Sequence, residues 1–327
     1  MSHTIKATTR MKALFQRETK PPVLLFPATT REAKMLEFLG YETFYVGAGA
    51  VIGPIVGRPD NGTITATESV QVSKWFVDAV SLPVWTDTDA CFGGIFQVES
   101  AVRELIKVGV AAITMEDQPF LGKRFGGMVG KEVVPIDEAI AKIRVASDVR
   151  DSLDADFQIV ARCDALTAAN AGSLSETIDR LAAYRDAGAD VLYLEGPRSL
   201  DEIAQAREAL LGPLTCTPFN LPQEITQAQG EELGLCAVFY LEASRLTKTV
   251  YLAIYKAILD GGYGAIEEMA ALLPSWTQDL GETSNSNVMA KLRAFEEKYL
   301  PERLLDKYDG DIIGSITVSP TAARVEH

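Results

Sequence analysis

Apolar runs of four to eight residues alternate with helix-like segments through most of this 327-residue chain. Continuous apolar strands that are each followed by a helix are typical of a parallel sheet covered by helices. The predicted strands are residues 23–27, 43–46, 84–89, 111–117, 157–164, 190–195, 214–219 and 237–241, and the predicted helices are residues 29–40, 67–80, 98–109, 136–153, 174–188, 200–210, 223–234 and 244–259. Eight such pairs in about 240 residues predict a closed α/β fold, the (β/α)8 or TIM barrel, with a doubly wound open sheet as the alternative. No GxGxxG motif follows the first strand, which counts against a dinucleotide-binding fold.

The chain is expected to have two parts. Residues 1–262 are predicted to form a catalytic barrel behind a short polar leader, and residues 263–327 a C-terminal helical extension with a polar tail. Helical patterns cover residues 266–273 and 285–300 of the extension. Because the extension is too long to serve barrel closure alone, we expect it to contact other subunits of an oligomer.

The charge and composition of the chain exclude several classes of partner. A net charge of −14 without a basic stripe argues against binding to nucleic acids. No apolar run of about 18 residues occurs and residues 1–20 are polar, so we expect a cytoplasmic protein without a membrane segment. The four cysteines, Cys91, Cys163, Cys216 and Cys236, form no CxxC pair and are predicted to be free thiols.

Histidine occurs only at positions 3 and 327. A catalytic triad, a histidine base or a histidine-bound zinc ion would therefore need a terminal tail. We expect the chemistry to depend on carboxylates, Lys, Arg, Tyr, Cys or a metal ion bound by oxygen. A shell made only of oxygen fits Mg²⁺, with Mn²⁺ also possible, rather than zinc or copper.

The segment Pro83–Gly94 ends an apolar run with two carboxylates, Asp87 and Asp89. Side chains at i and i+2 of a strand point to the same side. Other predicted strands lead to Glu116, Arg162, Glu195 and Asn220. Barrel chemistry lies at the carboxyl ends of the strands, so these groups should meet there, and a cation would relieve the repulsion between their carboxylates. For the segment taken alone, a capped turn with a solvated Asp89 is the alternative.

Two basic features accompany the carboxylates. Arg162 is suited to hold a substrate carboxylate or phosphonate through two parallel hydrogen bonds. The alternative is a salt bridge from Arg162 to Asp164 or Glu195. The glycine-rich segment 122–130 carries Lys123, and a mobile loop could close this residue over an anionic substrate. The alternative for this segment is a solvated surface turn.

In this order, the motifs resemble those of the isocitrate lyase and phosphoenolpyruvate mutase superfamily, in particular its 2-methylisocitrate lyase-like branch. The matching segments, within residues 10–270, are Tyr45–Gly49, Gly57–Asp60, Asp87–Asp89, Glu116–Gln118, Lys123–Arg124, Ala161–Ala165, Glu195 and Asn220. The resemblance implies a (β/α)8 barrel with Mg²⁺ and a homotetramer that exchanges C-terminal helices. It also implies a small carboxylic acid substrate and chemistry through an enolate.

The resemblance further implies a role for each matching residue. The metal ligands would be Asp87, Asp89 and Glu116. The substrate would contact Gly47, Ala48, Gly49, Asp60, Arg162 and Asn220. The catalytic residues would be Tyr45, Lys123, Arg162 and Glu195, with Tyr45 as a base or as a hydroxyl facing the enolate. The gating loop would contain Lys123, Arg124, Phe125, Gly126 and Gly127.

The loop departs from the superfamily pattern. Lyases of this group carry Lys-Lys/Arg-Cys-Gly-His, in which Cys is taken to protonate the departing enolate, but Phe125 and Gly127 stand at the Cys and His positions here. Gly47 replaces a Ser or Thr, and Cys91 replaces a Gly. These changes predict a less common substrate.

The leading functional hypothesis is a Mg²⁺-dependent carbon–carbon lyase that acts on a 2-hydroxy or 2-oxo di- or tricarboxylic acid. Cleavage would follow a retro-aldol or a decarboxylation route. The first alternative is a C–P mutase or hydrolase of the phosphonopyruvate type. The second is a barrel without catalytic activity that serves as a binding protein.

Overall fold

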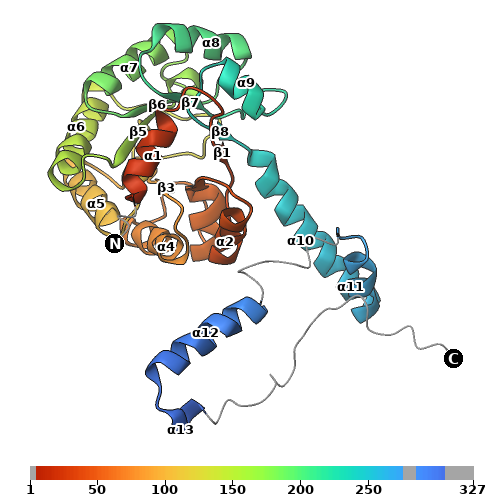
Figure 1. Ribbon diagram of the computed structural model, residues 1–327. Helices are drawn as coiled ribbons and strands as arrows, with labels where there is room; N and C mark the ends of the chain where they lie inside the picture. Colours follow the sequence, from red (N-terminus) through yellow and green to blue (C-terminus); the bar gives the residue numbers. More distant parts are fainter. Residues whose placement is uncertain (1–4, 275–284, 306–327) are drawn as a thin grey trace. The chain divides into compact units, whose positions relative to one another are not determined.

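Eight parallel strands surround a common core in this computed structural model, which describes residues 5–274 and 285–305 (Figure 1). The strands are β1 (Val23–Leu24), β2 (Phe44–Val46), β3 (Val84–Asp87), β4 (Ala112–Glu116), β5 (Gln158–Cys163), β6 (Val191–Leu194), β7 (Leu214–Cys216) and β8 (Val238–Phe239). Strands β2 to β7 pair in chain order, and β1 pairs with β8. Tyr45 N donates to Leu25 O at 3.0 Å and Cys236 N donates to Leu214 O at 2.8 Å, which joins the two sheets into a ring. The predicted barrel is confirmed, and the open sheet is wrong.

Helices α2 to α9 cover the outside of the strands (Figure 1). The helices are α1 (Ala7–Phe15), α2 (Thr30–Phe38), α3 (Gly53–Val56), α4 (Ala66–Ala79), α5 (Ile95–Lys107), α6 (Ile136–Leu153), α7 (Leu174–Asp186), α8 (Leu200–Ala209), α9 (Gln227–Glu232), α10 (Leu241–Gly261), α11 (Tyr263–Ala270), α12 (Asn285–Tyr299) and α13 (Glu302–Leu305), with a π-helical turn η1 (Ala48–Ile52) and a 3-10 turn η2 (Ala165–Thr167).

Polar N-cap residues fix where several of these helices begin. The side chains of Thr29, Thr65, Ser173, Ser199 and Thr226 each accept a hydrogen bond from the backbone N–H three residues later. Each of these helices lies in the connection that follows a strand. The carboxyl ends of the strands and the amino ends of the helices therefore lie at the same rim of the barrel, which is where the candidate site is found.

Helix α1 lies in the N-terminal segment whose polarity predicts only a leader. Its Met11 and Phe15 are buried, and the Phe15 ring packs edge-on against Trp85 at a centroid distance of 5.0 Å. Thr8 and Thr9 donate to Asp154 and Asp156, which precede β5. Helix α1 therefore covers the amino ends of the strands and leaves the opposite rim for the site.

The chain divides into two compact units, Met1–Ser244 and Arg245–His327. The division falls inside α10. Helix α11 overlaps the helix expected at residues 266–273 but begins and ends three residues earlier, and α12 matches the helix expected at residues 285–300 to within one residue. The boundary expected after residue 262 stays a prediction. None of the helices that the structure describes is long and apolar enough to cross a membrane.

Candidate active site

Carboxylates and cations meet at the rim where the strands end. Asp87 ends β3 and Asp89 lies in the following turn, Glu116 ends β4, Arg162 lies near the end of β5, and Glu195 follows β6. All five residues are buried, with exposed fractions between 0 and 8%. The structure thus brings together five side chains that the sequence distributes over four strands.

The turn after β3 has a strained backbone. Asp89, Cys91 and Phe92 have φ angles of 51°, 56° and 62°, a region that residues other than glycine rarely adopt. Asp87 Oδ1 accepts a hydrogen bond from Asp89 N at 3.1 Å, and Asp87 Oδ2 accepts one from Ala48 N at 3.3 Å. Strain of this kind is often kept at functional sites. Here it holds two carboxylates side by side in the interior.

Lys123 of the glycine-rich loop enters this carboxylate cluster. Its Nζ lies 2.7 Å from Asp89 Oδ1 and 3.8 Å from Glu116 Oε1, and it forms a close ion pair with Asp60. Its side chain is 2% exposed. A buried ammonium group is stable only beside opposite charge. Lys123 is therefore an internal counter-ion of three carboxylates and does not lie in a solvated turn.

Burial and neighbouring charges shift the pKa values of the carboxyl groups and of the Lys123 ammonium group. Burial raises the pKa of Asp89 to about 6, against the opposing charge of Lys123. It also raises the pKa of Asp87 and, well above its ordinary value, that of Glu116. Burial by itself would lower the pKa of Lys123, but Glu116, Asp89 and Asp60 outweigh it, and this pKa is raised. The cluster therefore keeps Lys123 charged and favours additional positive charge.

Arg162 is held by carboxylates on several sides. Its Nε and Nη2 each donate to Asp164 at 2.9 Å. Nη2 also lies 3.3 Å from Glu116 Oε2, and Nε lies 3.5 Å from Glu195 Oε2. The salt-bridge alternative for Arg162 is thus present in the structure. A substrate carboxylate that binds here has to share the guanidinium group with these residues.

The two carboxylate oxygens of Glu195 have different surroundings. Thr217 Oγ1 donates to Glu195 Oε2 and lies 2.5 Å from the Tyr193 hydroxyl. Glu195 Oε1 is buried and accepts no hydrogen bond from the residues that the structure describes. Burial, stronger than the opposing charge of Arg162, raises the pKa of Glu195. This carboxylate is therefore a better proton acceptor than an ordinary glutamate.

The glycine-rich loop covers Glu195 and Arg162. A Cβ atom at Gly126 would lie 2.7 Å from Glu195 Oε1 and 3.2 Å from Arg162 Nη2, so only glycine fits this close approach. Gln118 holds the loop, since its Nε2 donates to Arg124 O and its Oε1 accepts from Arg124 N, both at 3.0 Å.

The other members of the predicted gating loop differ in their contacts. The Phe125 ring packs edge-on against Phe219 at a centroid distance of 5.7 Å. Arg124 and Gly127 are exposed. Of the five predicted loop residues, Lys123 and Gly126 thus contact the buried charges most directly.

The turn after β2 brings the predicted substrate-binding glycines close to other site residues. A Cβ atom at Gly49 would lie 2.8 Å from Asp60 Oδ2, and one at Gly47 would lie 3.2 Å from the Tyr45 ring. Burial and then the charge of Asp87 raise the pKa of Tyr45 well above its ordinary value. Tyr45 therefore stays a neutral hydroxyl near neutral pH, which favours hydrogen-bond donation over a role as base.

Asn220 lies apart from the buried cluster. It is exposed, and its Nδ2 donates to Gly196 O at 2.9 Å. In this conformation it supports the loop after β6 and makes no contact with the buried charges among the described residues. Its predicted role in substrate binding stays a prediction.

Sequence reasoning missed four polar residues near Arg162 and its carboxylate partners. They are Lys131, Tyr184, Tyr193 and Thr217. Asp117 and Asp164 were placed at strand ends within the matching segments but were given no role in the site. Lys131 lies in a loop without a periodic pattern, and the three hydroxyl residues lie inside helix- or strand-like runs. Their sequence context carries no functional signal.

The residues present fit a hard divalent cation that keeps part of its water shell. Within the described residues, no three Asp, Glu, Cys or His side chains form a ready-made metal-binding group. Mg²⁺, however, usually retains several waters and binds one or two carboxylates. Asp89 and Glu116 already share the Lys123 ammonium, and Glu116 Oε1 accepts no hydrogen bond from the described residues. These oxygens are suitable donors for such a cation.

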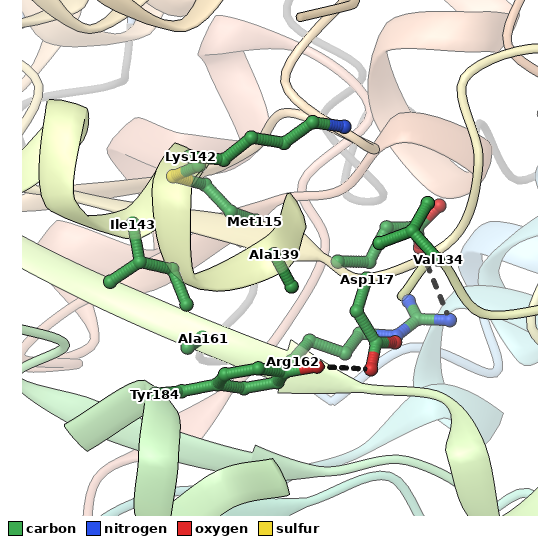
Figure 2. Close-up of a pocket in the computed structure, with 10 residues that line it drawn as sticks. Met115, Asp117, Val134, Ala139, Lys142, Ile143, Ala161, Arg162 and Tyr184 are labelled. Carbon is green, nitrogen blue, oxygen red and sulfur yellow. Dashed lines mark hydrogen bonds and ion pairs between the residues drawn. The ribbon is translucent and has the colours of Figure 1, made fainter. Parts of the chain in front are cut away.

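A cavity of about 10 Å³ lies between β4, β5 and helix α6. Figure 2 shows the Tyr184 hydroxyl pointing to Asp117 below Arg162, with Lys142 extending from α6 along the opposite wall. This volume is sufficient for about one water molecule. The cavity is too small to hold a substrate.

Buried carboxylates, a buried arginine and a lysine supplied by a loop, all at the rim of a closed (β/α)8 barrel, are the arrangement of a barrel enzyme. The sequence profile of the phosphoenolpyruvate phosphomutase family matches residues 16–259. A 2,3-dimethylmalate lyase of Eubacterium barkeri is 32% identical over 267 residues, which cover 81% of this chain and 83% of the relative. The chain belongs to the isocitrate lyase/phosphoenolpyruvate mutase superfamily, so the resemblance inferred from its motifs is confirmed.

Solved structures support this assignment. A crystal structure of 2,3-dimethylmalate lyase, a member of this superfamily, is similar to this chain with a TM-score of 0.75 and 25% sequence identity. The match covers 89% of this chain and 96% of that protein. Phosphonopyruvate hydrolase in complex with oxalate and Mg²⁺ has a TM-score of 0.74 and 25% identity, with coverage of 91% and 100%. These similar proteins include both a lyase and a hydrolase, so the reaction has to be argued from the site.

Proposed function

We propose that the protein is a carbon–carbon lyase, dependent on a divalent metal, that acts on a 2-hydroxy or 2-oxo di- or tricarboxylic acid through an enolate. The observation that carries the proposal is the buried cluster in which Lys123 lies between Asp60, Asp89 and Glu116, next to Arg162. Buried charges of this kind suit an anionic substrate on which more negative charge develops during the reaction. The similarity to 2,3-dimethylmalate lyase favours cleavage of a carbon–carbon bond.

Asp87, Asp89 and Glu116 are the residues that would hold Mg²⁺ or Mn²⁺. When bound, such an ion polarises the oxygens of an α-oxo or α-hydroxy carboxylate and lowers the cost of negative charge on them. Arg162 would bind a second carboxylate of the substrate. The hydroxyl of Tyr45, which burial keeps neutral, would donate a hydrogen bond to a substrate oxygen.

Glu195 is the proton acceptor that the geometry favours. Its Oε1 accepts no hydrogen bond within the described residues, and burial raises its pKa. In a retro-aldol step, the proton of the substrate 2-hydroxyl group moves to Glu195 and a carbonyl forms. The adjacent carbon–carbon bond breaks, and its electron pair goes to the enolate product. Closure of the loop at Gly126 keeps bulk water away during this step.

Phe125 and Gly127 leave the loop without the Cys and His of related lyases. Neither side chain can donate a proton to the enolate. We propose that the enolate is protonated by water after the carbon–carbon bond has broken and the loop has opened. The same argument applies to decarboxylation, in which carbon dioxide leaves and the enolate remains.

A substrate panel tests this function. Protein with Mg²⁺ is incubated separately with oxaloacetate, 2-methylisocitrate, 2,3-dimethylmalate and phosphonopyruvate, and pyruvate is followed by coupled reduction after subtraction of the enzyme-free rate. We expect turnover of at least one of the three carboxylic acids and its loss on addition of a chelator. Conversion of phosphonopyruvate alone, either to pyruvate by hydrolysis or to phosphoenolpyruvate by a mutase and followed by phosphorus NMR, would overturn the lyase assignment in favour of C–P chemistry. Absence of Mg²⁺ and oxalate binding at millimolar concentrations would favour a barrel without catalytic activity.

We also propose that the protein is a cytoplasmic homotetramer that exchanges C-terminal helices. In support, helix α10 has no buried residue, and its Leu252, Tyr255 and Leu259, which lie on one face of the helix, are 60%, 66% and 81% exposed. An apolar helix face of this kind is suited to contact a second copy of the chain. Light scattering after gel filtration should show a tetramer, and Leu252→Glu should shift it to smaller species. A monomeric wild-type protein would contradict this part of the proposal.

A further inference from the structure

Lys131 is a second buried lysine at the far end of the glycine-rich loop. It follows Gly130, which has a φ angle of 75°, and is 1% exposed. Its Nζ donates to Asp164 Oδ1 at 2.7 Å, and its backbone oxygen accepts from Ala169 N at 2.6 Å. Lys123 occupies the corresponding place near the start of the loop. Both ends of the loop are therefore fastened by buried ammonium groups to carboxylates of the site.

Asp164 is shared between Lys131 and Arg162. Its Oδ1 accepts from Lys131 Nζ and from Arg162 Nη2, and its Oδ2 accepts from Arg162 Nε. Its backbone N–H donates to Asp117 Oδ1 at 2.8 Å, which fixes the Asp164 main chain. Although burial acts to raise the pKa of Asp164, Arg162 and Lys131 hold it below its ordinary value. Asp164 is thus an ionised group held between two cations.

The charge balance shows what Lys131 contributes. Arg162 contacts Glu116, Asp164 and Glu195, so one guanidinium group faces three carboxylates. Lys131 Nζ donates to the same Asp164 oxygen as Arg162 Nη2, so Lys131 partly neutralises Asp164 and weakens the attraction of Asp164 for Arg162. Without Lys131, Arg162 would be the one cation within ion-pair distance of Asp164 among the described residues. The guanidinium group would then be drawn further toward Asp164 and away from a bound carboxylate.

We propose that Lys131 is a positioning residue that couples closure of the loop to the orientation of Arg162. Through Asp164 it keeps Arg162 available to the substrate, and through its own backbone it holds the loop over Glu195. The part of this inference that concerns Arg162 rests on the proposed function, in which Arg162 binds a substrate carboxylate. The part that concerns the loop stands on the Lys131 contacts alone.

The test compares Lys131→Met with Lys142→Met. Methionine keeps an apolar stem of similar length and removes the charge in both variants. Lys142 is a matched control because it is also buried, but its ion pair, at 3.5 Å, is with Glu138 of the same helix. Three quantities are measured: the rate of trypsin cleavage after Arg124, the affinity for oxalate in the presence of Mg²⁺ by calorimetry, and the midpoint of thermal unfolding.

We expect Lys131→Met to be cleaved at least tenfold faster and to bind oxalate about tenfold more weakly, in the range seen when a group that supports a direct ligand is removed. Lys142→Met should stay within about twofold of the wild type in both quantities, even if both variants unfold at lower temperature. The effects of Lys131→Met and Asp164→Asn on oxalate affinity should be non-additive, because the two residues act through one contact.

Two results would overturn the inference. One is that Lys131→Met changes cleavage and oxalate affinity no more than Lys142→Met does. The other is that the effects of Lys131→Met and Asp164→Asn add. If the wild-type protein does not bind oxalate, the proposed function fails, and the cleavage rates then decide the inference by themselves: equal rates in Lys131→Met and the wild type refute it.

Discussion

Replacing Lys123 by methionine should strengthen the binding of Mg²⁺. Lys123 Nζ lies 2.7 Å from Asp89 Oδ1. Mg²⁺ binds oxygen at about 2.1 Å, so an ion on that oxygen would lie at most about 4.8 Å from an ammonium group that stayed in place. With an effective dielectric constant of about 20, the repulsion between charges of +2 and +1 at this distance is about 7 kcal/mol. The ammonium group therefore has to move away when the metal binds.

The measured effect should be smaller than this repulsion. On leaving, Lys123 gives up its ion pairs with Asp60, Asp89 and Glu116 but regains contact with water. The net cost should be close to that of one hydrogen bond to a charged group, about 1.5–3 kcal/mol. Lys123→Met removes this cost, so the Kd for Mg²⁺ should fall by about 10- to 100-fold.

Titration calorimetry on chelator-treated protein at neutral pH measures this Kd directly. Arg124→Met is the matched control, since it removes a neighbouring charge that is exposed and lies outside the cluster. Its Kd should stay within about threefold of the wild type, as expected for a screened surface charge. An unchanged or weaker affinity in Lys123→Met would refute the argument that Lys123 and the metal compete for the same oxygens.

Three further predictions concern the loop, the barrel and the buried charges. Gly126→Ala places a Cβ atom 2.7 Å from Glu195 Oε1 and should keep the loop open, seen as faster tryptic cleavage of the loop; an unchanged rate would contradict the described packing. Gly230→Ala places a Cβ atom 2.3 Å from Val238 Cγ1 and should lower the free energy of unfolding, measured in urea, by about 1–3 kcal/mol. An unchanged urea midpoint would show that β8 can shift to accommodate the added atom. The pKa of Asp164 is held below its ordinary value of about 3.9, so below about pH 5 the native state binds fewer protons at this residue than the unfolded state does. The ionised Asp164 therefore stabilises the native state above about pH 3.9, and this stabilisation is lost as the pH falls through the lowered pKa. Asp164→Asn should remove this part of the acid destabilisation in unfolding curves between about pH 7 and pH 3, and identical slopes for variant and wild type would count against it.

The barrel could be predicted because its strands are apolar on both faces and its helices show a regular period. Helix α6 has the predicted bounds, Ile136–Leu153, since Pro135 and an acidic first turn mark its start. Helix α1 could not be predicted in the same way. It buries a narrow face, chiefly Met11 and Phe15, and the rest of the segment is polar. A short helix that is stabilised mainly by tertiary packing has no strong periodic pattern of apolar residues in its sequence.

The candidate site could be predicted only in part. The carboxylates follow from topology, because strand ends of a barrel meet at one rim. Topology does not tell which cation pairs with each carboxylate. The position of Lys123 between Asp89 and Glu116 and the contact of Lys131 with Asp164 could therefore not be predicted. Both depend on the path of a loop with left-handed residues at Gly122 and Gly130, and such turns have no periodic pattern.

The ring of strands is thinnest around β1 and β8, which form a separate two-stranded sheet, the seam of the barrel. Strands β1 and β8 are in register over two positions only, Val23 with Val238 and Leu24 with Phe239. Regions with few backbone hydrogen bonds open first in native-state hydrogen exchange, so this seam should form a cooperative unit of its own, weaker than the six-stranded sheet. In the ring, the seam lies opposite β4 and β5, which carry Glu116 and Arg162. The barrel can therefore fluctuate at its seam while the charged rim keeps its geometry.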